Sequence, residues 1–144
     1  MIALHSAWRW PAAALLLVVA AVHVPLVGDH LEEAPYVGVL FILLTVACVL
    51  LAGAILVADA PVMWAACGVV SVLALTAFLA SRTVGLPELG DDVGNWTEPL
   101  GYPALASEGM CAVLAALVLA RSRAGVGRHD RRDRPAGVGV EHRA

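Results

Sequence analysis

Four long apolar blocks, separated by short polar segments, dominate the chain. Asp, Glu, Lys and Arg are absent from residues 11–27, 36–57, 61–80 and 109–120. A bilayer core of about 30 Å needs about 20 helical residues to cross. The blocks lack the alternating apolar and polar pattern of a lipid-facing barrel strand, and their Ala, Leu and Val runs favour helix. The pattern predicts four membrane-spanning helices at about 10–27, 36–57, 61–82 and 103–120.

Composition supports this interpretation. Of the 144 residues, 60% are hydrophobic and 15% are charged, whereas soluble domains average about half and about a quarter. The first block could instead be a signal peptide with Arg9 as its positive flank. Trp8 and Trp10 argue against this, because they form the aromatic belt of a retained span. We therefore predict an all-α transmembrane four-helix bundle over residues 1–123, followed by a flexible, Arg- and Gly-rich tail over 124–144.

The basic residues predict the orientation of this bundle. Arg gathers beyond the fourth block, at positions 121, 123, 128, 131, 132, 134 and 143. The positive-inside rule places this tail in the cytoplasm, and four spans then place the N-terminus there too. Segments 28–35 and 83–102 become exterior loops. The complete absence of Lys suggests a GC-rich genome, so we expect a multi-pass protein of a bacterial inner (plasma) membrane.

The exterior segments are acidic and rich in turn-forming residues. Gly and Pro recur through 83–102 and favour a series of turns, and Trp96 suits a loop that lies on the headgroup region. The acidic residues on this side are Asp29, Glu32, Glu33, Glu88, Asp91, Asp92 and Glu98. They are either tolerated exterior charge or a mouth that attracts a cation or holds a ligand.

Three polar residues are predicted to lie inside the membrane at a similar depth. His23 lies near the outer end of the first span and Glu108 near the outer start of the fourth, both roughly 6 to 8 Å below the surface at 1.5 Å per residue. Arg82 closes the third span on the same side. Ionisable groups at such depth face the bundle and are paired, and we expect an Arg82–Glu108 ion pair.

The stretch "HVPLVGDHLEEAP", residues 23–35, suggests a metal site. If the first helix continues past Pro25, His30 stacks over His23 on one face, because seven residues are close to two turns. Two imidazoles with Glu32, Glu33 or Glu108 suit Zn²⁺, Cu²⁺ or non-haem iron by ligand type. The spacing matches no closed motif such as HExxH. The alternative is a structural cluster in which a hydrogen-bonded His23 packs near Glu108.

Other chemistries have less support in the sequence. A bis-His haem is not favoured, because only His23 lies within a span. Cys48, Cys67 and Cys111 fall singly in three spans without a CxxC pair, which favours packing rather than redox chemistry. Nucleic-acid binding is not expected, since the basic tail is explained as a topology anchor or a contact with anionic lipid.

The segments "HLEEAPYVGVLF" and "SRTVGLPELGDDVGNWTEPLG" with a following Glu resemble a group of small bacterial four-span membrane proteins. That group has an SRTxGLP loop, a downstream E-P-x-G and a Glu early in the last span. The resemblance implies the same four-helix fold, but no activity. The residues that it singles out are His23, His30, Glu33, Ser81, Arg82, Thr83, Gly85, Pro87, Glu98 and Glu108.

Two classes of function remain open at this stage. One is a transport-accessory or sensor protein that binds a cation or small ligand at an outward-facing His/Glu/Arg cluster. The other is a structural or assembly subunit of a larger envelope complex, as a homo-oligomer or with other proteins in the lipid bilayer. A third hypothesis, a membrane oxidoreductase subunit like the DoxX group, is supported only by the four-span architecture. A non-enzymatic role is therefore favoured.

Overall fold

The computed structural model describes residue 4 and residues 6–132, with side chains as far as residue 124. Within this part of the chain the fold is all-α, without any strand. The elements are α1 (Arg9–His23), η1 (Val24–Leu26), α2 (Val27–Glu33), α3 (Pro35–Ala58), α4 (Pro61–Thr83), η2 (Gly90–Asp92) and α5 (Gly101–Arg132).

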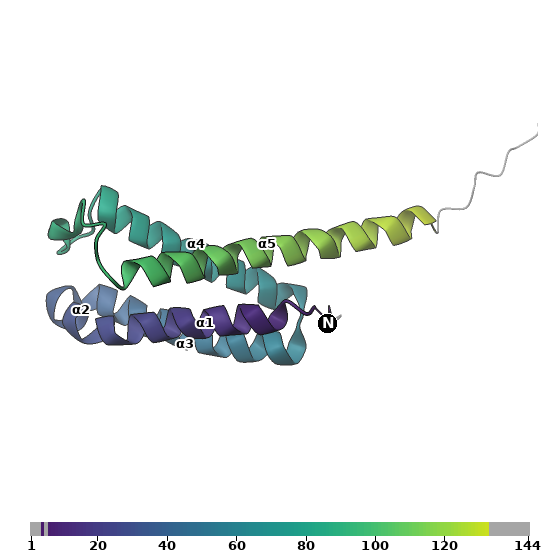
Figure 1. Cartoon of the computed structure of the whole chain (residues 1–144), viewed down its shortest axis with the longest axis horizontal. Coiled ribbons are helices and arrows are strands. Elements are labelled where there is room, and N and C mark those ends of the chain that lie inside the picture. Colours follow the sequence, from purple (N-terminus) through teal and green to yellow (C-terminus); the bar gives the residue numbers. More distant parts are fainter. Residues whose placement is uncertain (1–3, 5, 133–144) are drawn as a thin grey trace, which may run out of the picture.

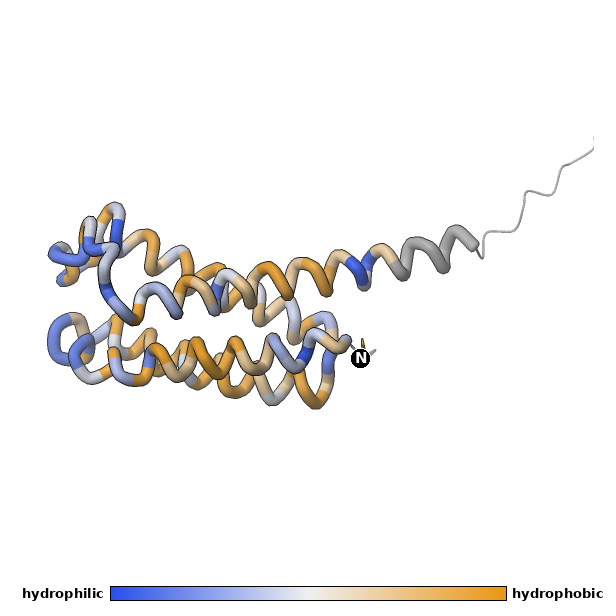
Figure 2. Tube along the Cα trace, in the orientation of Figure 1, coloured by the Kyte–Doolittle hydropathy of each residue, from blue (hydrophilic) through white to orange (hydrophobic). Residues whose placement is uncertain are grey.

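Four helical segments are long and apolar enough to cross a membrane, as predicted. They are Arg9–Glu33, Pro35–Ala58, Pro61–Thr83 and Gly101–Ala124. Figure 1 shows α1 beside α3 and α4 beside α5, and these two pairs pack most extensively. In Figure 2 hydrophilic residues gather at one end of the bundle, formed by α2 and the loop before α5. We call this the loop end, and residues 84–100 the 84–100 loop.

The predicted exterior loop at 28–35 is helical for most of its length, as α2. Pro25 lies at the start of the η1 turn, where its missing N–H costs little. The chain turns only at Ala34, which has extended backbone (φ −142°). A Cβ at Gly38 would lie 2.6 Å from the Leu31 side chain, so this glycine allows α2 to lie directly on α3.

A buried core fills the centre of the bundle. Its fully buried members come from all four crossing helices and include Leu16, Ile55, Trp64, Cys67 and Cys111. The cysteines at 48, 67 and 111 are free and buried, in agreement with their predicted role as small apolar packing residues.

At the end opposite the loop end, Asp59 connects α3, α4 and the N-terminal segment. It adopts the left-handed conformation (φ 40°, ψ 44°) that ends α3. Its buried carboxylate accepts hydrogen bonds from the Ser6 backbone N–H at 2.5 Å and from the Trp64 indole N–H at 2.7 Å. Its carbonyl oxygen accepts one from the Leu4 N–H at 2.8 Å.

The fourth crossing helix extends further than predicted. The helix α5 continues to Arg132, although the span was expected to end near 120 and the flexible tail to begin at 124. No proline follows Pro103 until Pro135, so no residue between them blocks the helical hydrogen bonds, and the glycines of this segment only weaken it. The rest of the predicted tail, 133–144, lies outside the described residues.

Candidate functional site

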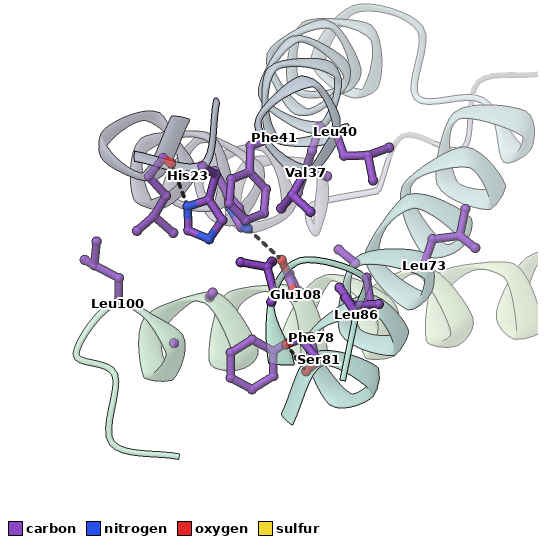
Figure 3. A pocket seen from close by; sticks show the side chains of 18 of the residues that line it. His23, Val37, Leu40, Phe41, Leu73, Phe78, Ser81, Leu86, Leu100 and Glu108 are labelled. Atoms are coloured by element: carbon purple, nitrogen blue, oxygen red, sulfur yellow. Dashed lines mark hydrogen bonds and ion pairs between the residues drawn. The ribbon is translucent and has the colours of Figure 1, made fainter. Parts of the chain in front are cut away.

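A cavity of about 350 Å³ lies at the loop end and is lined by residues of α1 to α5 and of the 84–100 loop. Most of its wall is apolar, with leucines from α3, α4 and the loop. Its polar lining consists of His23, His30, Ser81, Arg82, Asp92, Glu98 and Glu108. Figure 3 shows Glu108 on one side of this space and Phe41 on the other. Ligand sites in proteins have this make-up, a concave apolar pocket with a few polar groups.

His23 is held in a single orientation by its own helix. Its Nδ1 lies 2.8 Å from the carbonyl oxygen of Val19, one turn earlier in α1. A carbonyl only accepts, so Nδ1 carries the proton, and in the neutral ring Nε2 is an acceptor. This Nε2 lies 3.7 Å from Oε1 of Glu108, which is longer than a hydrogen bond. The side chains of His23 and Glu108 are thus close, and the lone pair on Nε2 of His23 remains available to a donor.

Glu108 is the most deeply buried polar group of the cavity. It lies in the third turn of α5, and only 2% of its surface is exposed. No hydrogen bond to its carboxyl group forms among the described residues, and its only ionic neighbour there is His23. Buried carboxyl groups are normally hydrogen-bonded, so Glu108 has unused hydrogen-bonding capacity toward the cavity.

His30 repeats the arrangement of His23 in α2, nearer the loop end. Its Nδ1 lies 2.9 Å from the carbonyl oxygen of Leu26, which again leaves Nε2 as an acceptor in the neutral ring. Phe41 of α3 contacts both imidazoles edge to face, at 5.0 Å from His23 and 4.9 Å from His30 between ring centres. The two histidines therefore contact the same ring, and Phe41 packs between the end of α1 and α2.

Arg82 has different partners from the predicted one. Its side chain, 4% exposed, forms an ion pair with Asp92 at 2.6 Å and a second with Glu98. Its guanidinium also lies 5.0 Å from the centre of the Phe78 ring. Glu108 lies beside His23 instead. The expected Arg82–Glu108 pair does not form, because the 84–100 loop folds back and brings two carboxylates to the end of α4.

Further contacts fix the 84–100 loop over the cavity. Gly85 and Gly94 adopt φ values of 81° and 79°, which glycine reaches without strain. The Gly94 N–H donates to the Arg82 carbonyl oxygen at 2.9 Å. On the α3 side, the Tyr36 hydroxyl donates to the Pro87 carbonyl oxygen at 2.6 Å. The loop thus bridges α3 and α4.

The remaining predicted site residues lie away from the cavity. Glu32, Glu33 and Asp91 are exposed. Trp96 is 46% exposed and packs edge to face on Phe78, with 6.5 Å between ring centres. The predicted metal ligands are not brought together: within the described part of the chain, no group of three or more His, Cys, Asp or Glu side chains is arranged to hold a metal ion.

Sequence reasoning missed some of the groups that build the site. Phe41 gives no signal beyond its place in an apolar span. Asp92 and Glu98 were recognised as loop acids but not as the partners of Arg82. The signal for that pairing is an Arg at the end of a span followed, within one glycine-rich loop, by two carboxylates that can reach it.

Comparison with known proteins gave no relative: no family model, curated protein or solved structure matches this chain.

Proposed function

We propose that this protein binds a small ligand in the membrane cavity at the loop end, with His23, His30 and Glu108 as its polar contacts. The loop end faces outward and both termini face the cytoplasm, in keeping with the Arg residues of the C-terminal segment. The role is that of a transport-accessory or sensor component.

One observation carries the proposal: a deeply buried carboxyl group and two oriented imidazoles face one cavity with unused hydrogen-bonding capacity. Ionisable groups within a membrane are costly, and by default they mark a functional site. The cavity volume of about 350 Å³ falls within the range of small-molecule sites, roughly 300 to 1,000 Å³. The carboxylates of Asp92 and Glu98 line the cavity at the loop end, where two negative charges face the single positive charge of Arg82. This favours a cationic or hydrogen-bond-donating ligand over an anionic one.

We expect a small molecule to accompany the protein when it is extracted directly into polymer-bounded discs of native lipid. Ala74, a half-buried residue of α4, lines the cavity, so Ala74→Phe fills part of the space. We expect this change to lower the amount of small molecule bound per mole of protein about tenfold. Ala14→Phe, on the exposed face of α1, is the matched control and should leave it unchanged. Mass spectrometry of the released small molecules, per mole of protein, measures both.

The proposal would be contradicted if Ala74→Phe and Ala14→Phe released equal amounts of the small molecule. It would also be contradicted if the unmodified protein carried no small molecule in stoichiometric amount. The cluster would then serve only to hold helices together in a structural or assembly subunit, and the 84–100 loop would be a docking surface.

The proposed orientation has its own test. Gly90 lies in the 84–100 loop with open space around it and no left-handed backbone, so a cysteine fits there. In intact cells we expect an impermeant thiol reagent to label Gly90→Cys but not Gly127→Cys, which becomes reactive only after the cells are opened. The reverse pattern would place the acidic loop in the cytoplasm.

A further inference from the structure

We propose that the ligand of this cavity is a membrane-dissolved amphiphile, with a hydrogen-bond-donating head group and a long apolar chain. The inference rests on the proposed function and specifies the class of ligand. The head group lies between His23 and Glu108, and the chain leaves the cavity between α3 and α4 into the hydrocarbon core of the bilayer.

Around His23, His30 and Glu108 the cavity offers hydrogen-bond acceptors. The guanidinium of Arg82 also lines the cavity, but its terminal nitrogens are paired with Asp92 and Glu98, and only its buried Nε–H has no partner among the described residues. The Nε2 atoms of His23 and His30 are acceptors in the neutral rings, because each Nδ1–H is already used by a backbone carbonyl. The Ser81 hydroxyl donates to the Phe78 carbonyl oxygen at 2.8 Å, which leaves only its lone pairs for a ligand. A hydroxyl or amine head supplies the donor that His23 and Glu108 lack, whereas an ester supplies none.

The rest of the cavity is an apolar channel along two facing helices. Its wall on these helices includes the aliphatic residues Leu40, Leu43, Leu44, Ala47, Val70, Leu73, Ala74 and Ala77. On α3, Leu40 and Ala47 are seven positions apart, which corresponds to roughly 10 Å of helix at 1.5 Å per residue. A hydrated metal ion or a sugar would lose hydration against such a wall without new partners. An alkyl or isoprenoid chain has no polar groups that would lose hydration there.

The channel opens toward lipid rather than water. Leu40, Leu43 and Leu73 line the cavity and are nevertheless 53%, 58% and 63% exposed, so they stand at its mouth on the outer face of the bundle. The helices α3 and α4 pack together less extensively than α1 with α3 or α4 with α5, which leaves this side open. At the loop end, Leu86 and Leu89 of the 84–100 loop cover the cavity. A ligand therefore enters from the bilayer.

The test uses hexadecan-1-ol with a diazirine at mid-chain as the probe, added to the full-length protein in native-lipid discs. After illumination, we expect peptide mapping to place the adducts on the facing residues of α3 and α4 rather than evenly over the lipid-exposed faces. Dodecan-1-ol should suppress these adducts at about one tenth of the concentration needed for methyl laurate, because loss of one buried hydrogen bond corresponds to about tenfold in affinity.

Variants connect the adducts to the named residues. Ala74→Phe blocks the channel and Glu108→Leu removes the polar contact, so each should lower the adduct yield about tenfold, while Ala14→Phe should not. Glu108→Gln keeps the shape and an acceptor oxygen, and should retain more labelling than Glu108→Leu. Size-exclusion profiles of all four variants establish that they remain folded.

Adducts spread evenly over all exposed helix faces, or equal competition by the alcohol and the ester, would overturn the inference. If a water-soluble molecule accompanies the protein and is lost in Ala74→Phe, the cavity binds a ligand but not an amphiphile. If no molecule accompanies the protein and no labelling depends on Ala74, both the inference and the proposed function fail.

Discussion

Replacing Arg82 by Met should lower the free energy of unfolding by about 3 to 5 kcal/mol, the cost of breaking a buried ion pair. The Arg82 side chain is 4% exposed, and its two partners, Asp92 and Glu98, are 26% exposed. Without the guanidinium, both carboxylates remain at the membrane surface without a cation. The 84–100 loop then loses its ion pairs with α4 and keeps the backbone hydrogen bond from the Gly94 N–H to the carbonyl oxygen of residue 82. The loop should therefore loosen, and the cavity should become more accessible to water. Unfolding by SDS, followed by circular dichroism of the purified protein, measures the change.

A compensated variant separates lost pairing from lost packing. In Arg82→Met/Asp92→Asn/Glu98→Gln no unpaired charge remains, and part of the lost stability should return because the amides can bond to water and to each other. Arg121→Met is the matched control, since Arg121 is exposed, and its effect should stay within about 0.5 kcal/mol. An Arg82→Met variant as stable as this control, or a triple variant no better than the single one, would contradict the role of the ion pairs.

The crossing helices could be predicted from sequence because the thickness of the bilayer sets their length. The first three apolar blocks are long enough to cross by themselves, and the fourth, 109–120, reaches that length together with the residues before it, which include Glu108. Their ends were harder to predict. The helix α2 packs on α3 through the contact between Leu31 and Gly38, which joins a residue of a predicted polar loop to one of a predicted span.

In the candidate site, too, the position of a residue along its helix could be predicted from sequence, but its partners across the fold could not. Counting residues from the span ends gives depth, and it correctly put His23 and Glu108 at one level, where the structure places them 3.7 Å apart. Depth does not specify the direction in which a side chain points around its helix. Arg82 and Glu108 share a level too, yet Arg82 pairs with Asp92 and Glu98, because the fold of a glycine-rich loop decides which carboxylate comes closest.

The metal hypothesis depended on ligand type alone. Two histidines with several nearby acids fit a transition metal in composition, but a metal site needs its ligands within bonding distance of one point. Glu32 and Glu33 instead face solvent on α2. The imidazoles of His23 and His30 contact the edges of the same ring, Phe41. Of the residues that the sequence grouped by chemistry, His23, His30 and Glu108 thus line the cavity, whereas Glu32 and Glu33 lie away from it.

At the opposite end of the bundle, Asp59→Ala should lower the free energy of unfolding by about 2 to 4 kcal/mol, because two donors lose their acceptor and each buried unsatisfied group costs about 1 to 3 kcal/mol. Those donors are the Ser6 backbone N–H and the indole N–H of fully buried Trp64. The loss should separate the N-terminal segment from the turn between α3 and α4. The same SDS titration measures it.

Two further substitutions at this position separate hydrogen bonding from backbone strain, since Asp59 has a φ of 40°. Asp59→Gly relieves any strain but removes both acceptors, so it should be nearly as unstable as Asp59→Ala. Asp59→Asn tolerates the left-handed conformation and keeps one acceptor oxygen, so it should lose about half as much. In a Trp64→Phe background, where one donor is already absent, Asp59→Ala should cost less than it does in the unmodified protein. If Asp59→Gly is as stable as the unmodified protein, the position matters only for its backbone conformation. If the losses of stability from Asp59→Ala and Trp64→Phe are additive, the carboxylate and the indole act independently.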